Sequence, residues 1–295
     1  MTTVTKAVIP AAGWGTRFLP FAKSVPKEML PLIDRPAIQY IVEEAVAAGI
    51  DDVVAVVSPH KKAIEDHFDR SKELEAVLDA GGKTTELAEV RALADLVDLH
   101  SVRQGEALGL GHAVGMARHH VGDHPFAVLL GDDMMHPDSP LLRDMIAATE
   151  RTGRSTIALM RVPQEDISLY GAASVEPLDG EDSLVRVTGL VEKPPADEAP
   201  SDLAVVGRYV FTPEIFDHID RTPPGRGGEI QLTDAIATLA ASSGVNGVVF
   251  EGGRYDVGNK RDYLRTVLEL GAERPDLRDD VLSVVAEFAR REGLV

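Results

Sequence analysis

The chain begins with an apolar run that leads into a glycine-containing loop, Lys6-Ala7-Val8-Ile9-Pro10-Ala11-Ala12-Gly13-Trp14-Gly15-Thr16-Arg17. The run at 6–10 is typical of a buried strand, because it is short and apolar and leads into a loop that contains glycines. A loop after such a strand lies where open α/β sheets bind ligands, and its small residues let phosphates approach the backbone N–H groups. The loop fits neither the P-loop nor the dinucleotide pattern. Taken alone, it is equally consistent with an ordinary tight turn.

Apolar segments alternate with helical patterns through the first half of the chain. We expect strands at 53–57, 97–102, 126–130 and 156–161, and helices at 36–48, 108–119 and 141–150. This alternation predicts an α/β fold with a Rossmann-like, mainly parallel mixed sheet flanked by helices. In the second half, the apolar segments 172–176 and 184–191 flank Asp179-Gly180-Glu181-Asp182 and predict a hairpin, which is followed by a strand at 203–211.

Composition excludes several classes of protein. The 295 residues include 48 acidic and 30 basic side chains, a net charge of −18, and no cysteine. Disulfides, thiolate metal sites and cysteine nucleophiles are therefore excluded. An acidic chain without a basic stripe argues against binding to nucleic acid or membranes. The sequence shows no signal-peptide pattern and no apolar run near the roughly 20 residues that span a bilayer, so we expect a cytoplasmic protein.

The first 33 residues differ from the rest, because they carry a local charge of +3. Either chance or a local anion site explains this asymmetry. Within this segment, Pro26-Lys27-Glu28-Met29-Leu30-Pro31 places a lysine between two prolines that restrict the backbone. The Lys27 ammonium group is a suitable partner for phosphate oxygens, although an exposed loop lysine is the alternative.

Aspartates follow two separate apolar segments. Asp132 and Asp133 come after the strand expected at 126–130, and Asp256 follows another short apolar segment. Mg²⁺ prefers one or two carboxylates together with substrate phosphates and water, so this pattern suits a magnesium site. Capping of the following segment by Asp132-Asp133 is the alternative.

In combination, these segments resemble the sugar-1-phosphate nucleotidylyltransferase family. The similarity covers roughly residues 4–270 and continues through Arg103-Gln104-Gly105, Gly109-Leu110-Gly111-His112-Ala113, Gly131-Asp132, Tyr170-Gly171, Glu192-Lys193-Pro194, Gly228-Glu229-Ile230-Gln231-Leu232-Thr233-Asp234 and Tyr255-Asp256-Val257-Gly258. The Pro26–Pro31 segment and Ile38-Gln39-Tyr40 are most similar to the members that join UTP and glucose 1-phosphate.

The resemblance implies a nucleotide-diphospho-sugar transferase fold and an enzyme that converts UTP and glucose 1-phosphate to UDP-glucose and pyrophosphate. It also implies dependence on Mg²⁺ and assembly as a homodimer or homotetramer. A relative that uses another nucleotide, such as dTTP, or another sugar 1-phosphate is the main alternative. A non-catalytic regulatory paralogue is a further alternative, and a dehydrogenase is disfavoured because the third glycine of its motif is missing.

The family motifs also assign roles to residues of this chain. The resemblance implies that Arg17, Lys27 and Lys193 are catalytic and that Asp132 and Asp256 bind the metal, with Asp132 preferred over Asp133. It implies that the nucleotide is bound by Ala11, Ala12, Gly13, Gly15, Gln104, Gly109 and Asp132. It implies that the sugar is bound by Gly171, Glu192, Lys193 and Gly207. His112 is expected to be a packing residue.

The chain is expected to have one catalytic domain, residues 1–258, with a nucleotide half at about 1–135 and a sugar half at about 136–258. Residues 259–295 are expected to form two helices separated by Gly271 and Pro275, each with an apolar stripe. These stripes either pack on the sheet or form a subunit interface.

Overall fold

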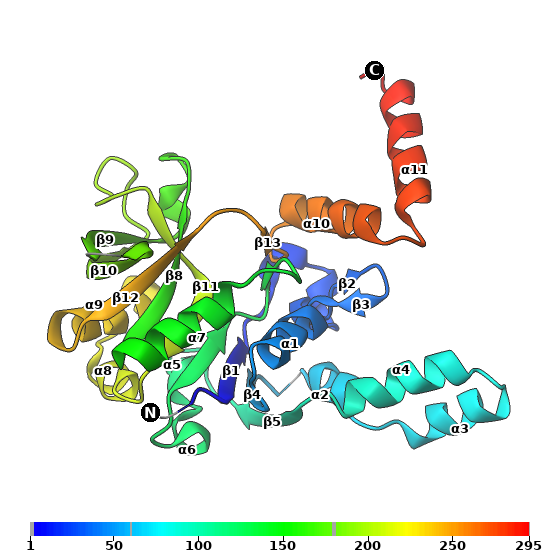
Figure 1. The fold of residues 1–295 in the computed structure, drawn as a ribbon, viewed down its shortest axis with the longest axis horizontal. Helices are drawn as coiled ribbons and strands as arrows, with labels where there is room; N and C mark the ends of the chain where they lie inside the picture. Colours follow the sequence, from blue (N-terminus) through cyan, green and yellow to red (C-terminus); the bar gives the residue numbers. More distant parts are fainter. Residues whose placement is uncertain (1–2, 60, 179–180, 295) are drawn as a thin grey trace.

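The computed structural model describes residues 3–59, 61–178 and 181–294. Within these residues, the main sheet has nine strands in the order β5–β4–β1–β6–β11–β8–β12–β10–β9 (Figure 1). They are β1 (Lys6–Ala11), β4 (Asp52–Val57), β5 (Asp98–Arg103), β6 (Phe126–Leu129), β8 (Ser155–Arg161), β9 (Gly171–Leu178), β10 (Glu181–Glu192), β11 (Leu203–Phe211) and β12 (Val245–Phe250). The predicted fold class, a mixed sheet built on βαβ units, is confirmed.

The half of the sheet around β1 is parallel, as the alternating pattern predicted. β1 pairs in parallel with β4 and β6, and β4 pairs in parallel with β5. Val, Ile and Ala side chains fill both faces of β1 and β4, which is typical of a sheet that is covered on both sides. Because the strands are parallel, the loops after Ala11 and Leu129 lie at the same edge of the sheet.

The other half of the sheet is mixed. β11 runs antiparallel to both β6 and β8, while β12 runs parallel to β8. β9 and β10 form the predicted antiparallel hairpin. The turn expected at Asp179-Gly180 lies outside the described residues. In the sheet, β11 lies between β6 on one side and β8 on the other. It therefore joins the parallel strands beside the glycine loop to the strands of the expected sugar half.

The described residues form eleven α-helices, several of which cover the two faces of the sheet. They are α1 (Ala37–Ala47), α2 (Lys62–Phe68), α3 (Lys72–Ala80), α4 (Thr84–Ala94), α5 (Leu110–Gly115), α6 (Arg118–Val121), α7 (Leu141–Thr152), α8 (Ile215–Arg221), α9 (Leu232–Ser242), α10 (Lys260–Glu273) and α11 (Arg278–Arg291). Ile9 on β1 packs in one core with residues of α1 and α7, and its neighbour Val8 packs in a second core with residues of α5, α8 and α9. Alternate residues of a strand face opposite sides, so β1 contributes to both cores.

The helix expected at 108–119 is divided into α5 and α6. α5 begins only after Gly109, which has a φ of 105°, and the chain leaves the helix between Gly115 and Arg118. Gly111 and Gly115 lower the helix propensity of this segment, and hydrophobic spacing alone does not reveal that effect.

Two short antiparallel pairs lie outside the main sheet, and the sequence predicted neither. One joins β2 (Pro31–Leu32) to β3 (Arg35–Pro36), and the other joins β7 (Asp133–Met135) to β13 (Arg254–Asp256). In the second pair, Asp256 lies opposite Asp133. This pairing brings together two acidic segments that are more than a hundred residues apart in the chain.

The C-terminal residues form two helices, as predicted, and the break between them contains Pro275, as expected, but not Gly271. Gly271 is buried inside α10, and α11 begins after Leu277. α10 packs on the body through Leu270, whereas none of the residues of α11, all of which the structure describes, is buried. Figure 1 shows α11 projecting away from the rest of the molecule. In the described part of the chain, every helix is too short or too polar to cross a membrane.

Candidate active site

The glycine loop after β1 forms one wall of a cavity of about 290 Å³. The cavity is lined by Gly13, Trp14, Gly15, Thr16, Arg17, Phe18, Lys27, Asp132 and Gly258. Gly15 has a φ of 64°, and a Cβ at this position would lie 3.1 Å from Cβ of Lys27. Glycine therefore allows the loop to turn and to pack against Lys27. Ala11 and Ala12, which were expected to bind the nucleotide, are buried where the loop begins.

Lys27 lies between this loop and Asp132. Its Nζ is 2.5 Å from Asp132 Oδ2, and a Cβ at Gly13 would lie 3.9 Å from the same nitrogen. Burial lowers the pKa of Lys27, but Asp132 and Glu28 outweigh burial, so the pKa is raised overall. Burial raises the pKa of Asp132, but Lys27 and Arg17 outweigh it, so that pKa is lowered overall. Both groups of the pair are therefore charged at neutral pH.

The two expected metal ligands converge at Gly258. A Cβ at Gly258 would lie 2.5 Å from Asp132 Oδ2 and 3.1 Å from Asp256 Oδ1, so a single point faces both carboxylates. Burial raises the pKa of Asp256, and Asp132 and Asp133 add to the rise against the opposing charge of Arg254. A divalent cation would relieve this repulsion, so these residues fit a site of two carboxylates completed by phosphates and water.

Asp133 is directed elsewhere. Its Oδ2 accepts a hydrogen bond of 2.8 Å from the N–H of Gly207, and its Oδ1 lies 2.8 Å from Nε of Arg254. This arrangement supports Asp132 as the ligand in preference to Asp133. It also shows why position 207 is glycine, because a Cβ there would lie 2.7 Å from Asp133 Oδ2. Gly207 was expected to bind sugar, and in the structure its N–H group is engaged by Asp133.

A buried ion pair supports the turn that holds Lys27. Glu28 is fully buried, and Nζ of Lys61 lies 2.8 and 2.7 Å from its two carboxylate oxygens. Burial raises the pKa of Glu28 despite the two neighbouring lysines. A Cβ at Gly131 would lie 2.9 Å from Cγ of Glu28, so the pair packs beneath the turn that leads to Asp132. Sequence reasoning missed Lys61, because it lies more than thirty residues away from Glu28 and in no recognised motif.

Gln104 and Gly109, which were expected to bind the nucleotide, lie together. The buried Gln104 side chain donates from Nε2 to Nδ1 of His112 at 2.9 Å and to the carbonyl of Gly109 at 3.3 Å. A Cβ at Gly109 would lie 2.8 Å from the carbonyl oxygen of Ile230, so the loop packs closely against the segment before α9. His112, expected only to pack, also orients the Gln104 amide. Both bonds use Nε2, and the described residues provide no hydrogen-bond donor to Oε1.

Three of the four expected sugar residues, Gly171, Glu192 and Lys193, meet where β9 pairs with the end of β10. Gly171 lies opposite Glu192 in this pairing. Oε2 of Glu192 accepts a hydrogen bond of 2.7 Å from Oγ1 of Thr233, and Oε1 lies 3.2 Å from Nζ of Lys193. Thr233 also lies next to Gly171, where a Cβ would come within 3.2 Å of its side chain. Thr233 stood in a motif without an assigned role, and the structure shows that it orients Glu192.

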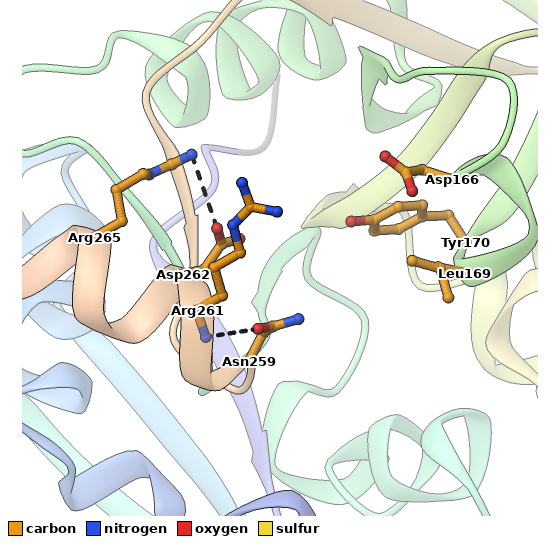
Figure 2. Close-up of a pocket in the computed structure, with 7 residues that line it drawn as sticks. All are labelled: Asp166, Leu169, Tyr170, Asn259, Arg261, Asp262 and Arg265. Atoms are coloured by element: carbon orange, nitrogen blue, oxygen red, sulfur yellow. Dashed lines mark hydrogen bonds and ion pairs between the residues drawn. The ribbon is translucent and has the colours of Figure 1, made fainter. Parts of the chain in front are cut away.

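A second cavity lies beside this edge. Its volume is about 470 Å³, and it is lined by Asp166, Leu169, Tyr170, Asn259, Arg261, Asp262 and Arg265. Figure 2 shows Tyr170 on one side of the gap and the first turn of α10 on the other. Tyr170 directly precedes Gly171, and Asn259 directly follows Gly258. The cavity therefore lies between the expected sugar and metal residues.

A third cluster of polar side chains is found at the opposite edge of the sheet. Asp52, His100 and His120 have potential ligand atoms within 4.8 Å of one another. Asp52 already contacts Nζ of Lys6 at 2.7 Å and Nε2 of His120 at 2.6 Å. The hydrogen bonds from Lys6 and His120 lower the pKa of Asp52, although burial opposes them. Its charge is thus compensated within the chain, in contrast to that of Asp256, whose pKa is raised.

Known proteins resemble this chain over its whole length. A relative from Bacillus subtilis (strain 168), named UTP--glucose-1-phosphate uridylyltransferase, is 50% identical over 294 residues and covers 100% of both chains. A relative of the same name from Staphylococcus epidermidis is 47% identical over 98% of this chain and 99% of its own.

Solved structures are similar as well. A UTP-bound UGPase from Acinetobacter baumannii is 42% identical, with a TM-score of 0.89 over 97% of this chain and 99% of that chain. A UDP-glucose pyrophosphorylase complexed with UDP-glucose is 38% identical, with a TM-score of 0.84 over 92% of this chain and 100% of that chain. The family model described as Nucleotidyl transferase matches residues 6–273. The glycine loop, the acidic turn after β6 and the strand pairing that completes the site thus occur in a chain that belongs to the nucleotidyl transferase family.

Proposed function

We propose that the chain transfers the uridylyl group of UTP to α-D-glucose 1-phosphate, which gives UDP-glucose and pyrophosphate. The proposal rests on one observation above all, the convergence of Lys27, Asp132 and Asp256 beside the glycine loop. Cationic and carboxylate groups placed together in this way can hold a polyphosphate and the metal that accompanies it. The relative from B. subtilis and the UTP-bound structure from A. baumannii support the identity of the nucleotide and the sugar.

The reaction is an in-line displacement at phosphorus. An oxygen of the sugar phosphate attacks the α-phosphorus of UTP, and the bond to the β-phosphate oxygen breaks, so that its electron pair leaves with pyrophosphate. The attacking phosphate is already ionised, because its second pKa is about 6, and no general base is required. The task of the protein is to hold two polyanions in the correct geometry and to balance their charge.

The residues of the chain divide this task between the two substrates. Arg17 and Lys27 hold the phosphates of UTP at the glycine loop and stabilise the departing pyrophosphate. Lys193 holds the sugar phosphate, and Glu192 accepts hydrogen bonds from sugar hydroxyls. Asp132 and Asp256 hold Mg²⁺. The bound ion would supply positive charge at the reacting phosphates.

The orientation of Gln104 supports a uracil or thymine base. With Nε2 engaged by His112 and Gly109, the remaining Oε1 is a hydrogen-bond acceptor. Uracil and thymine present an N–H group at N3 that can donate to this acceptor, whereas cytosine presents a lone pair there. This difference favours UTP and dTTP over CTP, and the similarity to the uridylyltransferases favours UTP.

Residues 1–258 form the catalytic unit of this proposal, with the nucleotide half at about 1–135 and the sugar half at about 136–258. The C-terminal helices assemble the chain into a homodimer or homotetramer. Exposed apolar side chains on these helices support this role, and they are Leu264, Leu268, Leu282, Val284, Val285 and Phe288.

A pyrophosphate-release assay tests the reaction. The purified chain is given glucose 1-phosphate, Mg²⁺ and, in separate reactions, UTP, dTTP, ATP, GTP or CTP. We expect UTP to give the highest kcat/KM, dTTP to follow, and excess chelator to abolish turnover. Equal rates with all five nucleotides would contradict the assigned base, and the absence of turnover with UTP would contradict the proposed reaction.

A further inference from the structure

The guanidinium group of Arg254 lies between the proposed metal and sugar residues. Arg254 is in β13, two residues before Asp256, and its side chain is only 9% exposed. Its Nε lies 2.8 Å from Oδ1 of Asp133, the residue directly after Asp132. One side of the guanidinium group is therefore held by β7, which directly follows Asp132 and pairs with the strand that carries Asp256.

The other side of Arg254 contacts the sugar edge. Its guanidinium carbon lies 5.2 Å from the centre of the Tyr170 ring, and Nη1 donates to the Tyr170 hydroxyl at 3.3 Å. The carbonyl of Tyr170 accepts a hydrogen bond of 3.0 Å from the N–H of Lys193. Tyr170 is thus tied through its backbone to the lysine that would hold the sugar phosphate.

An arginine is well suited to this position. Its planar group can pair with a carboxylate along one edge while its face stacks on an aromatic ring, which a lysine ammonium cannot do with the same geometry. The negative charge of Asp133 also needs a cationic partner, because this carboxylate is buried and its other oxygen accepts the hydrogen bond from Gly207. The contacts of Arg254 therefore fix the separation and the relative orientation of Asp133 and Tyr170.

We propose that Arg254 is a positioning residue that couples the binding of the sugar 1-phosphate to the binding of the metal-bound nucleotide. This inference rests on the proposed function, because it assigns a role within that same site. Arg254 acts through Asp133 on the two metal ligands and through Tyr170 on Lys193. Without Arg254, the metal ligands and the sugar residues are all still present, but their positions relative to each other are no longer fixed.

Binding of UDP-glucose tests this coupling without turnover, because the ligand spans both parts of the site. Its affinity is measured by calorimetry with and without Mg²⁺ for the wild type, Arg254→Met and Arg254→Lys. In the wild type, we expect Mg²⁺ to strengthen binding. In Arg254→Met, we expect this enhancement to fall by about tenfold, the lower end of the effect of losing a residue that supports metal ligands. Arg254→Lys keeps the charge and should lie between the two.

Steady-state kinetics give a second measurement. In Arg254→Met, KM for glucose 1-phosphate at saturating UTP and Mg²⁺ should rise by about tenfold, whereas Kd of UTP measured with Mg²⁺ and without the sugar should change by less than about threefold. A residue that only stabilises the fold would change both constants alike or neither. If Arg254→Met does not fold, Tyr170→Leu removes the other partner at a partly exposed position and should shift the same quantities in the same direction.

Arg118→Met is the matched control. Arg118 also combines carboxylate partners, Asp217 and Asp220, with an aromatic ring, that of Phe216, but it lies on α6 and contacts none of the proposed site residues. This variant should keep the wild-type enhancement by Mg²⁺. An unchanged enhancement in both Arg254→Met and Tyr170→Leu would overturn the positioning role alone. A wild-type chain that does not bind UDP-glucose would contradict the proposed function, and this inference with it.

Discussion

Nζ of Lys27 lies 2.5 Å from Oδ2 of Asp132, and the same carboxylate oxygen lies beside Gly258, which also contacts Asp256. The cation expected to hold substrate phosphate and the carboxylate expected to hold metal are thus direct partners. When phosphate and metal bind, each partner can exchange this ion pair for a charged group of the ligand. The charged states of Lys27 and Asp132 therefore depend on each other. Substitution of either residue should affect the binding of both the phosphates and the metal.

We expect Asp132→Asn to lower kcat by about a hundredfold or more, because a carboxylate that would hold the metal at the reacting phosphates is lost. Lys27→Met should lower kcat/KM for UTP and should also raise the pKa of Asp132, whose main stabilising charge is removed. Pyrophosphate release at several Mg²⁺ concentrations measures the first effect. A kcat of Asp132→Asn equal to that of the wild type would refute the role of this carboxylate. Full wild-type activity in excess chelator would refute the role of the metal.

The raised pKa of Asp256 predicts opposite effects on stability and activity. Its pKa is higher in the folded chain than in the unfolded chain, so folding disfavours its charged form. This unfavourable contribution is absent at low pH and develops as the pH rises through the folded-state pKa. Asp256→Asn should therefore raise the melting temperature at pH 7 without divalent metal, while it lowers kcat.

Thermal unfolding at pH 7 and at pH 4 checks this sign. The gain in melting temperature should be larger at pH 7, and Mg²⁺ should stabilise the wild type more than the variant. A variant that is less stable than the wild type at pH 7 without metal would show that the carboxylate is not under electrostatic strain.

Selection of the base should depend on His112 as well as on Gln104. His112→Ala leaves Nε2 of Gln104 with only its 3.3 Å bond to the carbonyl of Gly109, so the amide can rotate more readily and present either a donor or an acceptor to the base. We expect the ratio of kcat/KM for UTP to that for CTP to fall by about tenfold, which corresponds to one hydrogen bond. KM for glucose 1-phosphate serves as the control and should remain near the wild-type value. An unchanged ratio would mean that His112 only packs.

Glu192 and Lys193 should affect the sugar substrate in different ways. Glu192→Ala should weaken discrimination among hexose 1-phosphates, because a site built on hydroxyl hydrogen bonds rejects analogues that lack them. Lys193→Ala should impair all sugar 1-phosphates alike. Thr233→Val removes the hydroxyl that orients Glu192 and should show the Glu192 pattern in weaker form. These effects are measured as kcat/KM with glucose, galactose and mannose 1-phosphates. The same decrease in kcat/KM for every sugar in all three variants would contradict the separate roles of Glu192 and Lys193.

Removal of α11 should reduce assembly. Deletion of residues 276–295 removes Leu282, Val284, Val285 and Phe288, which are 43–64% exposed on a helix with no buried residue. We expect a smaller mass in analytical ultracentrifugation, with metal and UTP affinity near the wild-type values. Phe288→Glu should act in the same direction with less change to the chain, and Val77→Glu, on the exposed face of α3, is the control. A truncated chain of full oligomeric mass would contradict the interface.

The local signals in the sequence were reliable where short segments determine their own structure. The run before Gly13 forms β1, the pattern of 36–48 forms α1, and the segments around residue 180 form the β9–β10 hairpin. Apolar periodicity and turn residues act within about ten positions, so they can be recognised without the rest of the chain. The glycine loop and the Lys27 segment were visible for the same reason.

The tertiary structure decided which of these residues meet. Asp256 reaches Asp132 only because β13 pairs with β7, and Lys61 reaches Glu28 only because α2 begins below the turn after Pro26. The roles of Arg254, His112 and Thr233 arise from contacts with residues that are distant in the chain or placed by other elements. Hydrophobic periodicity does not predict such contacts, because they depend on the order of the strands in the whole sheet. The sequence by itself thus determined the separate elements and the chemistry available on them, and packing of the complete chain decided the geometry of the site.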